Sequence, residues 1–348
     1  MTKHRLFWPV VALLTLLLVN LVLSPSFFAI SIREGHLYGS LVDILRFGAP
    51  LILVALGMTL VVATGGIDLS VGSVVAISAA VACLHISGLA DQSGLGGVLV
   101  AVGMALGLAT ALGLWNGLLV SVFGVQPIIA TLILMVAGRG LAQLITSGQI
   151  ITVTSGPFRV LGGGYWAGLP ASILVALGMV VVAAVAVRRS ALGLLVESVG
   201  GNPEASRLSG ISSRSILLMV YACCGLCAGL AGLMISSNVS SADGNNAGLW
   251  IELDAILAVV ICGTLLSGGR FSLGGTVVGA LFIQTLTTTV YTLGVPPEST
   301  LLFKALVVTA VCLVQSPAFR ARLSRLRGKP GPGGRAMKDD RKKVEVSA

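Results

Sequence analysis

Few residues of this 348-residue chain combine types and spacings that could carry chemistry. The three histidines, His4, His36 and His85, lack the nucleophile and carboxylate partners that acid–base catalysis needs. Cys224 and Cys227 form a C-x-x-C pair, which in a soluble protein indicates a redox centre or a metal site. Because no histidine or charged residue accompanies the pair in its apolar run, we interpret both cysteines as small packing residues. The sequence therefore predicts no catalytic residue, no metal site and no cofactor bound by this chain.

A charged residue within an apolar run is a second kind of chemical signal. Arg139 occupies the middle of such a run, and Gln143 follows four residues later, on the same face of a helix. A charge inside lipid costs roughly 2.5–3.5 kcal/mol on insertion scales, so it usually marks a path or a paired group. Two interpretations stay open. The two side chains bind the hydroxyl groups of a polar solute, or Arg139 caps backbone carbonyls or pairs with an acid elsewhere.

Asp68 and a later polar cluster complete the candidates. Asp68 follows Gly65-Gly66 and precedes an apolar run, which fits either a helix N-cap or a gate residue. The later cluster lies near the start of another apolar run, where it either meets an incoming solute or a partner protein or forms an ordinary solvated helix end. Its members are Asp243, Asn245, Asn246, Glu252 and Asp254.

The composition places these residues in a membrane. Only 10% of the residues are charged, against about 25% in soluble domains, and the mean hydropathy is +1.00. Most of the net charge of +9 lies in residues 320–348, which hold ten Lys and Arg and three acids. Because the rest of the chain is nearly neutral, this charge does not indicate nucleic-acid binding. Residues 320–348 are rich in Pro, Gly and mixed charge, so we predict a disordered basic tail after a membrane domain of residues 1–319.

Ten apolar runs approach the length of about 20 residues that a helix needs to cross a bilayer about 30 Å thick. We therefore predict an all-α, polytopic membrane protein of about ten transmembrane helices. The first run lacks a convincing signal-peptide cleavage site, so we expect it to stay attached. The runs are residues 6–24, 44–64, 68–88, 96–123, 127–147, 169–187, 214–236, 250–267, 272–293 and 299–316.

The distribution of Lys and Arg predicts how these helices are oriented. Basic residues gather near the N-terminus, in the loop 188–215 and in the C-terminal tail, whereas the loops between them on the opposite side hold very few. Such a bias marks the cytoplasmic side of a membrane protein. An even number of spans then places both termini and the loop 188–215 in the cytoplasm.

A glycine-punctuated pattern occurs twice in the chain. Shifting residues 57–78 (GMTLVVATGGIDLSVGSVVAIS) by 203 positions aligns Gly65-Gly66 with Gly268-Gly269 in residues 263–281 (GTLLSGGRFSLGGTVVGAL). Broken apolar helices that recur are typical of transporters built from two related halves. We therefore predict an internal repeat of two halves, with both breaks toward the cytoplasmic side. The alternative is that these glycines only allow close helix packing.

The loop 188–215 carries the signals of a helix start and a helix end. Asn202 fits an N-cap, Pro203 the first helical position, and Glu204 the positive end of the helix dipole. Gly210 is expected to end the helix, so we predict one short helix at residues 203–209 between two turns. That helix is either a docking element or an ordinary amphipathic connector.

Three segments resemble the permease subunits of bacterial ribose-type sugar ABC importers. They are GMTLVVATGGIDLSVGSVVAIS, ESVGGNPEASRLSGI and ELDAILAVVICGTLLSGGRFSLGGTVVGA, and the resemblance extends over about residues 40–316. It implies a subunit of the bacterial inner membrane that moves a monosaccharide into the cytoplasm by alternating access. Within this family, residues 135–150 and 245–261 are most similar to the galactofuranose importers, which implies galactofuranose as the sugar.

The resemblance also implies partners and site residues. Two ATP-binding cassette ATPases, a periplasmic sugar-binding protein and a second permease, identical or similar, complete such an importer. The chain has no GxxxxGK[ST] motif, so ATP belongs to the partner subunit. The resemblance assigns a coupling helix that docks on the ATPase to Gly200, Gly201, Asn202, Pro203, Glu204, Ala205, Arg207, Leu208 and Gly210. We expect the path or gate to comprise Gly65, Gly66, Asp68, Arg139, Gln143, Asn245, Asn246, Gly268 and Gly269.

Two other classes of protein remain as alternatives. An ion-coupled secondary transporter for a small polar solute needs an acid in mid-membrane to bind Na⁺ or H⁺. The acids of this chain lie at the ends of the apolar runs, which argues against that class. An intramembrane enzyme needs a nucleophile with a base, or paired carboxylates, in mid-membrane, and the sequence offers neither.

Overall fold

The computed structural model describes residues 7–23, 25–33, 35–166, 168–294, 296 and 299–315. The chain divides into two compact units, residues 1–294 and 295–348. The first unit holds helices α1 to α12, and the second is described only through helix α13 (Thr300–Gln315). The tail expected at residues 320–348 lies outside the described residues, so its disorder stays a prediction.

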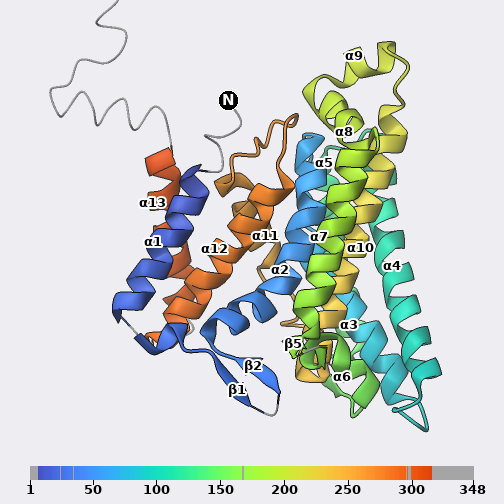
Figure 1. Cartoon of the computed structure of the whole chain (residues 1–348). Coiled ribbons are helices and arrows are strands. Elements are labelled where there is room, and N and C mark those ends of the chain that lie inside the picture. The colour runs from blue at the N-terminus through green and yellow to red at the C-terminus, as the bar shows by residue number, and fades with distance from the viewer. Residues whose placement is uncertain are drawn as a thin grey trace, which may run out of the picture. The chain divides into compact units, whose positions relative to one another are not determined.

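A helix lies at each of the ten apolar runs (Figure 1). Six of these helices, α2, α4, α5, α7, α10 and α12, are long and apolar enough to cross a membrane by length and composition. The other four are shorter, so the count of ten spans and the internal repeat stay predictions. Those of the ten that belong to the first unit are α1 (Phe7–Leu23), α2 (Ser40–Ala63), α3 (Val71–Ser87), α4 (Leu95–Ser121), α5 (Pro127–Ile145), α7 (Ala171–Arg189), α10 (Ser213–Val239), α11 (Ile251–Ile261) and α12 (Leu273–Thr292).

The core of the first unit lies where α2, α3 and α4 pack against α10. Small residues bring these backbones close together: a Cβ added to Gly225 of α10 would lie 3.0 Å from the Cα of Gly113 in α4. Gly57 of α2 likewise leaves room for Cys224, whose Cα would be 2.8 Å from an added Cβ. Such close approach gains dispersion energy where lipid removes the hydrophobic drive between helices. Cys224 and Cys227 are buried in this packing, as the sequence predicted.

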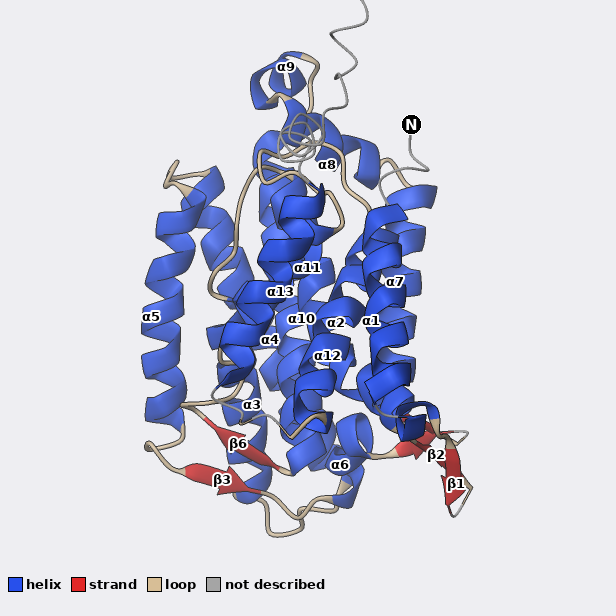
Figure 2. Cartoon of the chain, turned by 90° about the vertical axis from the view of Figure 1, so that its left-hand side faces the viewer, coloured by secondary structure: helices blue, strands red, loops and turns tan. Residues whose placement is uncertain are grey.

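Short paired strands correct the expectation of a purely helical chain. They pair as β1 (Ser31–Arg33) with β2 (His36–Tyr38), β3 (Ile150–Thr152) with β6 (Ser241–Asp243), and β4 (Tyr165–Trp166) with β5 (Leu169–Pro170). All three antiparallel pairs lie at the end of the first unit opposite to helices α8 and α9, together with α6 (Gly156–Gly163) and near the 3₁₀ turn Pro25–Phe28 (Figure 2). Pairing satisfies backbone groups that connecting loops would otherwise leave to water.

Two expected helix boundaries are wrong. The run at 68–88 becomes helical only at Val71, and the run at 250–267 is helical only to Ile261. Gly65 has a φ of +82° and precedes α3. Gly263 and Gly268 have φ values of +80° and +85° and follow α11. Because a right-handed helix requires negative φ, these positions interrupt it. The segments 64–70 and 262–272 are therefore irregular, and we call them the first break and the second break.

Candidate coupling and translocation site

Two consecutive helices project from one end of the first unit: α8 (Leu192–Gly201) and α9 (Pro203–Leu208) (Figure 1). The start and end expected for α9 are confirmed, because Asn202 Oδ1 accepts the Ala205 N–H at 3.0 Å and Gly210 follows the helix at a φ of +82°. The expectation of a single helix in this loop is wrong, since α8 precedes it. Apolar residues at helical spacing, ending in Val196 and Val199, were the signal for α8, and both are buried.

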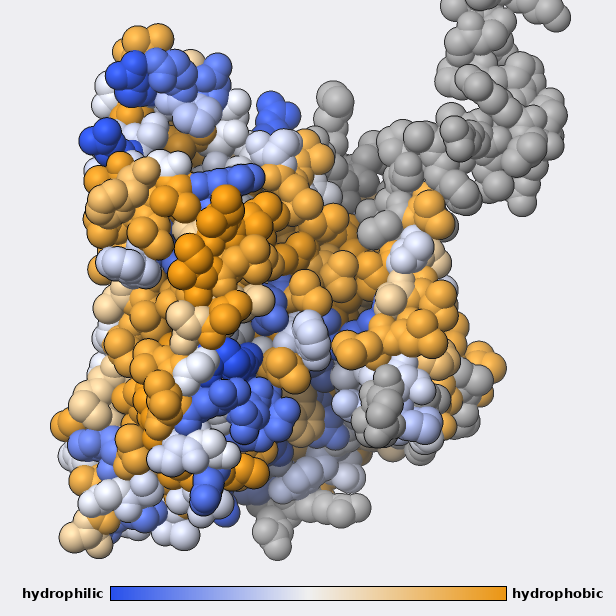
Figure 3. All heavy atoms as spheres, turned by 180° about the vertical axis from the view of Figure 1, so that it is seen from behind, coloured by the Kyte–Doolittle hydropathy of each residue, from blue (hydrophilic) through white to orange (hydrophobic). Residues whose placement is uncertain are grey.

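The outer surface of α9 carries one ion pair and one exposed apolar side chain. Arg207 Nη2 lies 2.6 Å from Glu204 Oε1, and the side chain of Leu208 is 78% exposed. The hydrogen bond from Arg207 and its positive charge lower the pKa of Glu204, so this carboxyl is ionised at neutral pH. Figure 3 shows hydrophilic residues gathered at this end of the molecule, above a largely apolar surface. A capped helix with a charged and apolar tip is suited to contact another protein.

The two breaks and the end of α8 meet backbone to backbone. The Gly269 N–H donates to the Ala63 carbonyl at 2.8 Å. A Cβ added to Gly268 would lie 2.7 Å from the Gly200 carbonyl oxygen and 2.9 Å from the Gly65 nitrogen. We call these five residues, Ala63, Gly65, Gly200, Gly268 and Gly269, the glycine junction. The junction brings together four residues that the sequence assigned to separate motifs, and it lies at the α8 end of the unit.

Asp68 lies in a buried hydrogen-bonded turn within the first break. It is 2% exposed, and its Oδ1 accepts the Ser70 N–H at 3.0 Å and the Ser70 hydroxyl at 2.6 Å. Asn116 Nδ2 of α4 donates to the same hydroxyl at 2.8 Å. Ser70, not Asp68, stands at the N-cap position of α3, so the N-cap expectation is wrong. Gly66 lies beside Tyr221, whose hydroxyl oxygen would be 2.7 Å from an added Cβ.

Arg139 holds the turn that leads into α11. Its Nη1 donates to the Ala247 carbonyl at 2.7 Å and to the Gly244 and Asn245 carbonyls at 3.4 Å. Of the two interpretations that the sequence left open, the structure shows carbonyl capping. Gln143 is exposed on α5, beside a shallow hollow, and its place in the transport path stays a prediction.

The same turn is also closed from its other side. Asp243 Oδ1 accepts the Asn245 N–H at 2.8 Å, and Asn246 Nδ2 donates to Asp243 Oδ2 at 2.7 Å. Desolvation raises the pKa of Asp243, but the hydrogen bonds from Asn246 and Asn245 and the charge of Arg139 outweigh it and lower that pKa. Asn245 is thus a turn residue, while Asn246 also lines a cavity.

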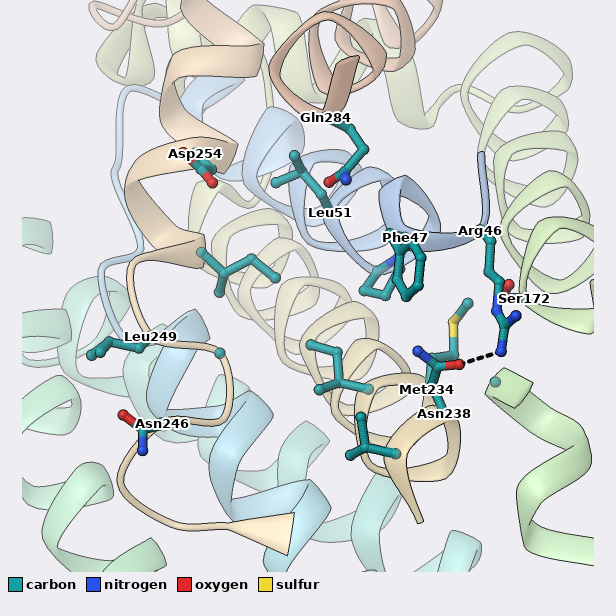
Figure 4. A pocket seen from close by; sticks show the side chains of 16 residues that line it. Arg46, Phe47, Leu51, Ser172, Met234, Asn238, Asn246, Leu249, Asp254 and Gln284 are labelled. Carbon is teal, nitrogen blue, oxygen red and sulfur yellow. Dashed lines mark hydrogen bonds between the residues drawn. The ribbon is translucent and has the colours of Figure 1, made fainter. Parts of the chain in front are cut away.

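That cavity has a volume of about 380 Å³ and lies between α2, α10, α11 and α12. Figure 4 shows its polar side chains converging from several elements, with Arg46 Nη2 donating to Asn238 Oδ1 at 2.6 Å. The polar residues that line it are Arg46, Ser172, Asn238, Asn246, Asp254 and Gln284. Arg46, Asn238 and Gln284 were not predicted from the sequence, although each is a polar residue inside a mainly apolar helix, which was the available signal.

The described residues contain no group of three or more His, Cys, Asp or Glu side chains placed to hold a metal ion. What they offer is a docking helix, a backbone junction beneath it, and a polar cavity.

Comparison with known proteins places the chain among transport permeases. Residues 40–312 match the family model described as "Branched-chain amino acid transport system / permease component". The galactofuranose transporter permease YtfT of Escherichia coli K12 is 46% identical, over 94% of this chain and 96% of that protein. The fructose import permease FruF of Bifidobacterium longum NCC 2705 is 39% identical, over 98% of this chain and 95% of that protein. The ribose import permease RbsC of E. coli K12 is 38% identical, over 88% of this chain and 92% of that protein. No solved structure matches the chain.

Proposed function

Because the chain belongs to this family of transport-system permease components, we propose that it is the membrane channel of an ATP-driven monosaccharide importer in a bacterial inner membrane. The chain is a transport permease and not an enzyme. Its relatives are named for galactofuranose, fructose and ribose, three sugars that form five-membered rings. Galactofuranose is the first candidate, since the relative named for it shares 46% of its residues with this chain.

The glycine junction is the observation that carries the proposed mechanism. ATP binding closes two separate ATPase subunits, which move α9 and, through the cap at Asn202, α8. Because Gly200 lies against Ala63 at the end of α2 and against Gly269 in the second break, any displacement of α8 changes the packing of α2 and of the segment before α12. The two breaks then open the channel toward one side of the membrane and close it toward the other, as in alternating access.

The remaining parts of the importer follow from this assignment. Two ATPases dock on two permeases, which are two copies of this chain or this chain and a similar one. A periplasmic sugar-binding protein delivers the sugar at the end that carries the paired strands. The end with α8 and α9 then lies in the cytoplasm together with both chain termini, in agreement with the distribution of Lys and Arg.

Ion-coupled transport is the second candidate, and a specific observation favours it. The carboxyls of Asp68 and Glu252 are buried, at 2% and 7% exposure, although the sequence placed both at the ends of apolar runs. A buried acid in a helix break is a common feature of Na⁺- and H⁺-driven carriers.

A charge reversal on α9 separates the two candidates. Glu204→Lys removes an exposed ion pair, which contributes little to stability. The ATP-driven mechanism predicts that uptake in intact cells falls about tenfold, while the amount of protein in the membrane stays constant. Asp91→Lys, the same charge change at an exposed site in the α3–α4 connection, controls for the effect of the charge change on the amount of protein in the membrane. Unchanged uptake in Glu204→Lys would contradict docking at α9.

A further inference from the structure

The cavity between α2, α10, α11 and α12 has the size and the lining of a small-molecule site. Its volume of about 380 Å³ falls within the range of about 300–1,000 Å³ that is usual for ligand pockets. Apolar side chains, among them Phe47 and Leu51, form part of its wall, and polar groups form the rest. Figure 4 shows Arg46 and Asp254 on opposite sides of it, so the cavity carries both a cation and a carboxylate.

Two polar atoms of lining residues are buried without a hydrogen-bond partner in the protein. They are Nε of Arg46 and Oγ of Ser172, and Ser172 is 2% exposed. An unsatisfied buried polar atom loses its hydrogen bonds to water without replacing them, so most native proteins avoid it. These two atoms belong to residues that line one cavity, and they leave hydrogen-bonding capacity that a bound ligand can use.

The guanidinium of Arg46 is held in place before any ligand arrives. Its Nη2 donates to Asn238 Oδ1 at 2.6 Å, and its Cζ lies 5.6 Å from the centre of the Phe47 ring and 5.9 Å from that of Tyr165. A fixed donor loses little conformational entropy when it binds, which favours affinity.

The lining matches the chemistry of a neutral sugar. Arg46 and Ser172 offer donors, Asp254 offers acceptors, and the amides of Asn246 and Gln284 offer both. The ring of Phe47, 48% exposed, provides an apolar surface for the C–H face of a sugar. An anion would meet the Asp254 carboxylate, and an apolar molecule would bury the charge of Arg46 without compensation.

We infer that this cavity is a binding site for one neutral monosaccharide inside the permease, with Arg46, Ser172, Asn246 and Gln284 contacting its hydroxyl groups. The inference rests on the proposed function for its choice of ligand. It adds to that function a stage at which the permease itself holds and selects the sugar, apart from the separate binding protein.

Direct binding to the purified permease–ATPase complex, without the sugar-binding protein, tests the inference. The probes are tritiated D-galactose, D-fructose and D-ribose. Unlabelled methyl β-D-galactofuranoside and methyl β-D-galactopyranoside serve as competitors that report the preferred ring size. We expect saturable binding of at least one probe and competition by at least one galactoside.

Ser172→Ala is the sharpest variant, because it removes an unpaired hydroxyl. We expect the dissociation constant of the bound sugar to rise about fivefold, while the melting temperature without sugar stays the same or rises slightly, since the unsatisfied atom is gone. Gln284→Met, which keeps the side-chain length and removes the amide, should weaken binding in the same way and provides the test if Ser172→Ala fails to fold. Ser121→Ala is the matched control, because Ser121 at the end of α4 has a buried unpaired hydroxyl away from the cavity.

The outcomes separate this inference from the proposed function. No saturable binding, or binding unchanged in both cavity variants, overturns the inference. ATP-driven sugar uptake by the same complex, reconstituted with the sugar-binding protein, would still support the proposed function. Saturable binding that weakens in the cavity variants but not in Ser121→Ala supports the inference. If the wild-type complex binds sugar but fails to transport it with ATP even after the sugar-binding protein is added to proteoliposomes, the proposed function is contradicted while the binding site is supported.

Discussion

Arg139 shows how one residue determines the path of a segment far away in sequence. Three backbone carbonyls of the turn before α11 accept hydrogen bonds from its Nη1. Asn245 is exposed to water, whereas the bonds to the Gly244 and Ala247 carbonyls are partly buried, so the loss of these two bonds is the costly part. The charge within α5 is thus compensated by carbonyl dipoles and by the acids Asp243 and Glu252, which act on it electrostatically.

Replacing Arg139 should therefore destabilise the protein rather than only slow transport. Arg139→Ala leaves the carbonyls unpaired, and we expect a loss of about 2 kcal/mol in stability, measured as a lower melting temperature in detergent. Gln143→Ala, four residues along the same helix and exposed, is the control and should melt like the wild type. If Arg139→Ala kept the wild-type melting temperature and lost uptake, the side chain would act in the transport path instead.

Asp68, in the first break, can likewise be tested for a stabilising role against a role in transport. Asp68→Ala removes the acceptor of two hydrogen bonds from Ser70, and we expect stability to fall by about 1–3 kcal/mol. Asp68→Asn keeps an oxygen at that place, so most of the stability and of the uptake should remain. Melting temperature and uptake are measured for both variants. Loss of uptake in a stable Asp68→Asn protein would show that the charge itself is needed, which would favour ion coupling.

Local residue signals could be predicted from the sequence, and distant contacts could not. The cap at Asn202, the start at Pro203 and the stop at Gly210 depend only on neighbouring residues, and all three are confirmed. The partners of Arg139 lie more than 100 residues away, so its role stayed open. The pairing of Arg46 with Asn238 likewise requires α2 and α10 to be packed side by side.

At the scale of helices, the glycine junction keeps the end of α8 and the two breaks in backbone contact. Gly200 is tightly enclosed, since an added Cβ would lie 2.7 Å from the Gly269 nitrogen and even closer to the Ala63 carbonyl oxygen. Gly201, the next residue, has nothing within 4 Å of an added Cβ. The chain thus offers a pair of adjacent glycines of which only one is packed.

This pair gives a direct test of how α8 is connected to the channel. Gly200→Ala should push α8 away from the breaks, and we expect uptake to fall about tenfold while the complex still hydrolyses ATP, a loss of about 1.4 kcal/mol in coupling. Gly201→Ala adds a methyl group to space that is open within this chain, so it should leave α8 in place, and any loss of uptake in it would report docking on the ATPase. Uptake and ATP hydrolysis are measured on the same preparations. Equal effects of both substitutions would exclude a specific role of the junction.

The positions of the helices could be predicted from the apolar runs, but some of their ends could not. Each expected run contains a helix, yet α3 begins three residues late and α11 ends six residues early. Apolar composition continues through both breaks, so hydropathy alone could not locate them. The positive φ of Gly65, Gly263 and Gly268 is a property of the folded backbone, and glycine permits it without requiring it. Helix α8 was missed because its run of ten residues is too short to stand out as a span.

For the whole molecule, the helices divide into an inner and an outer group. The apolar window of α2 is 78% buried and that of α10 is 61% buried, against 22% for α4, 28% for α5 and 17% for α7. The outer helices therefore present their apolar sides to lipid or to a second permease. Composition predicted the membrane environment, but this division depends on packing. The paired strands were missed because they are only two or three residues long, and β3 pairs with a strand some 90 residues away.

The central claim is that this chain conducts a monosaccharide only when a separate ATPase drives it. The most direct measurement is uptake of tritiated D-galactose into proteoliposomes that hold the permease with its ATPase and sugar-binding protein, or the permease alone. We predict that uptake requires ATP and all components and that methyl β-D-galactofuranoside suppresses it. A Na⁺ or proton gradient should not drive uptake in place of ATP. Gradient-driven uptake by the permease alone would contradict the account and establish an ion-coupled carrier.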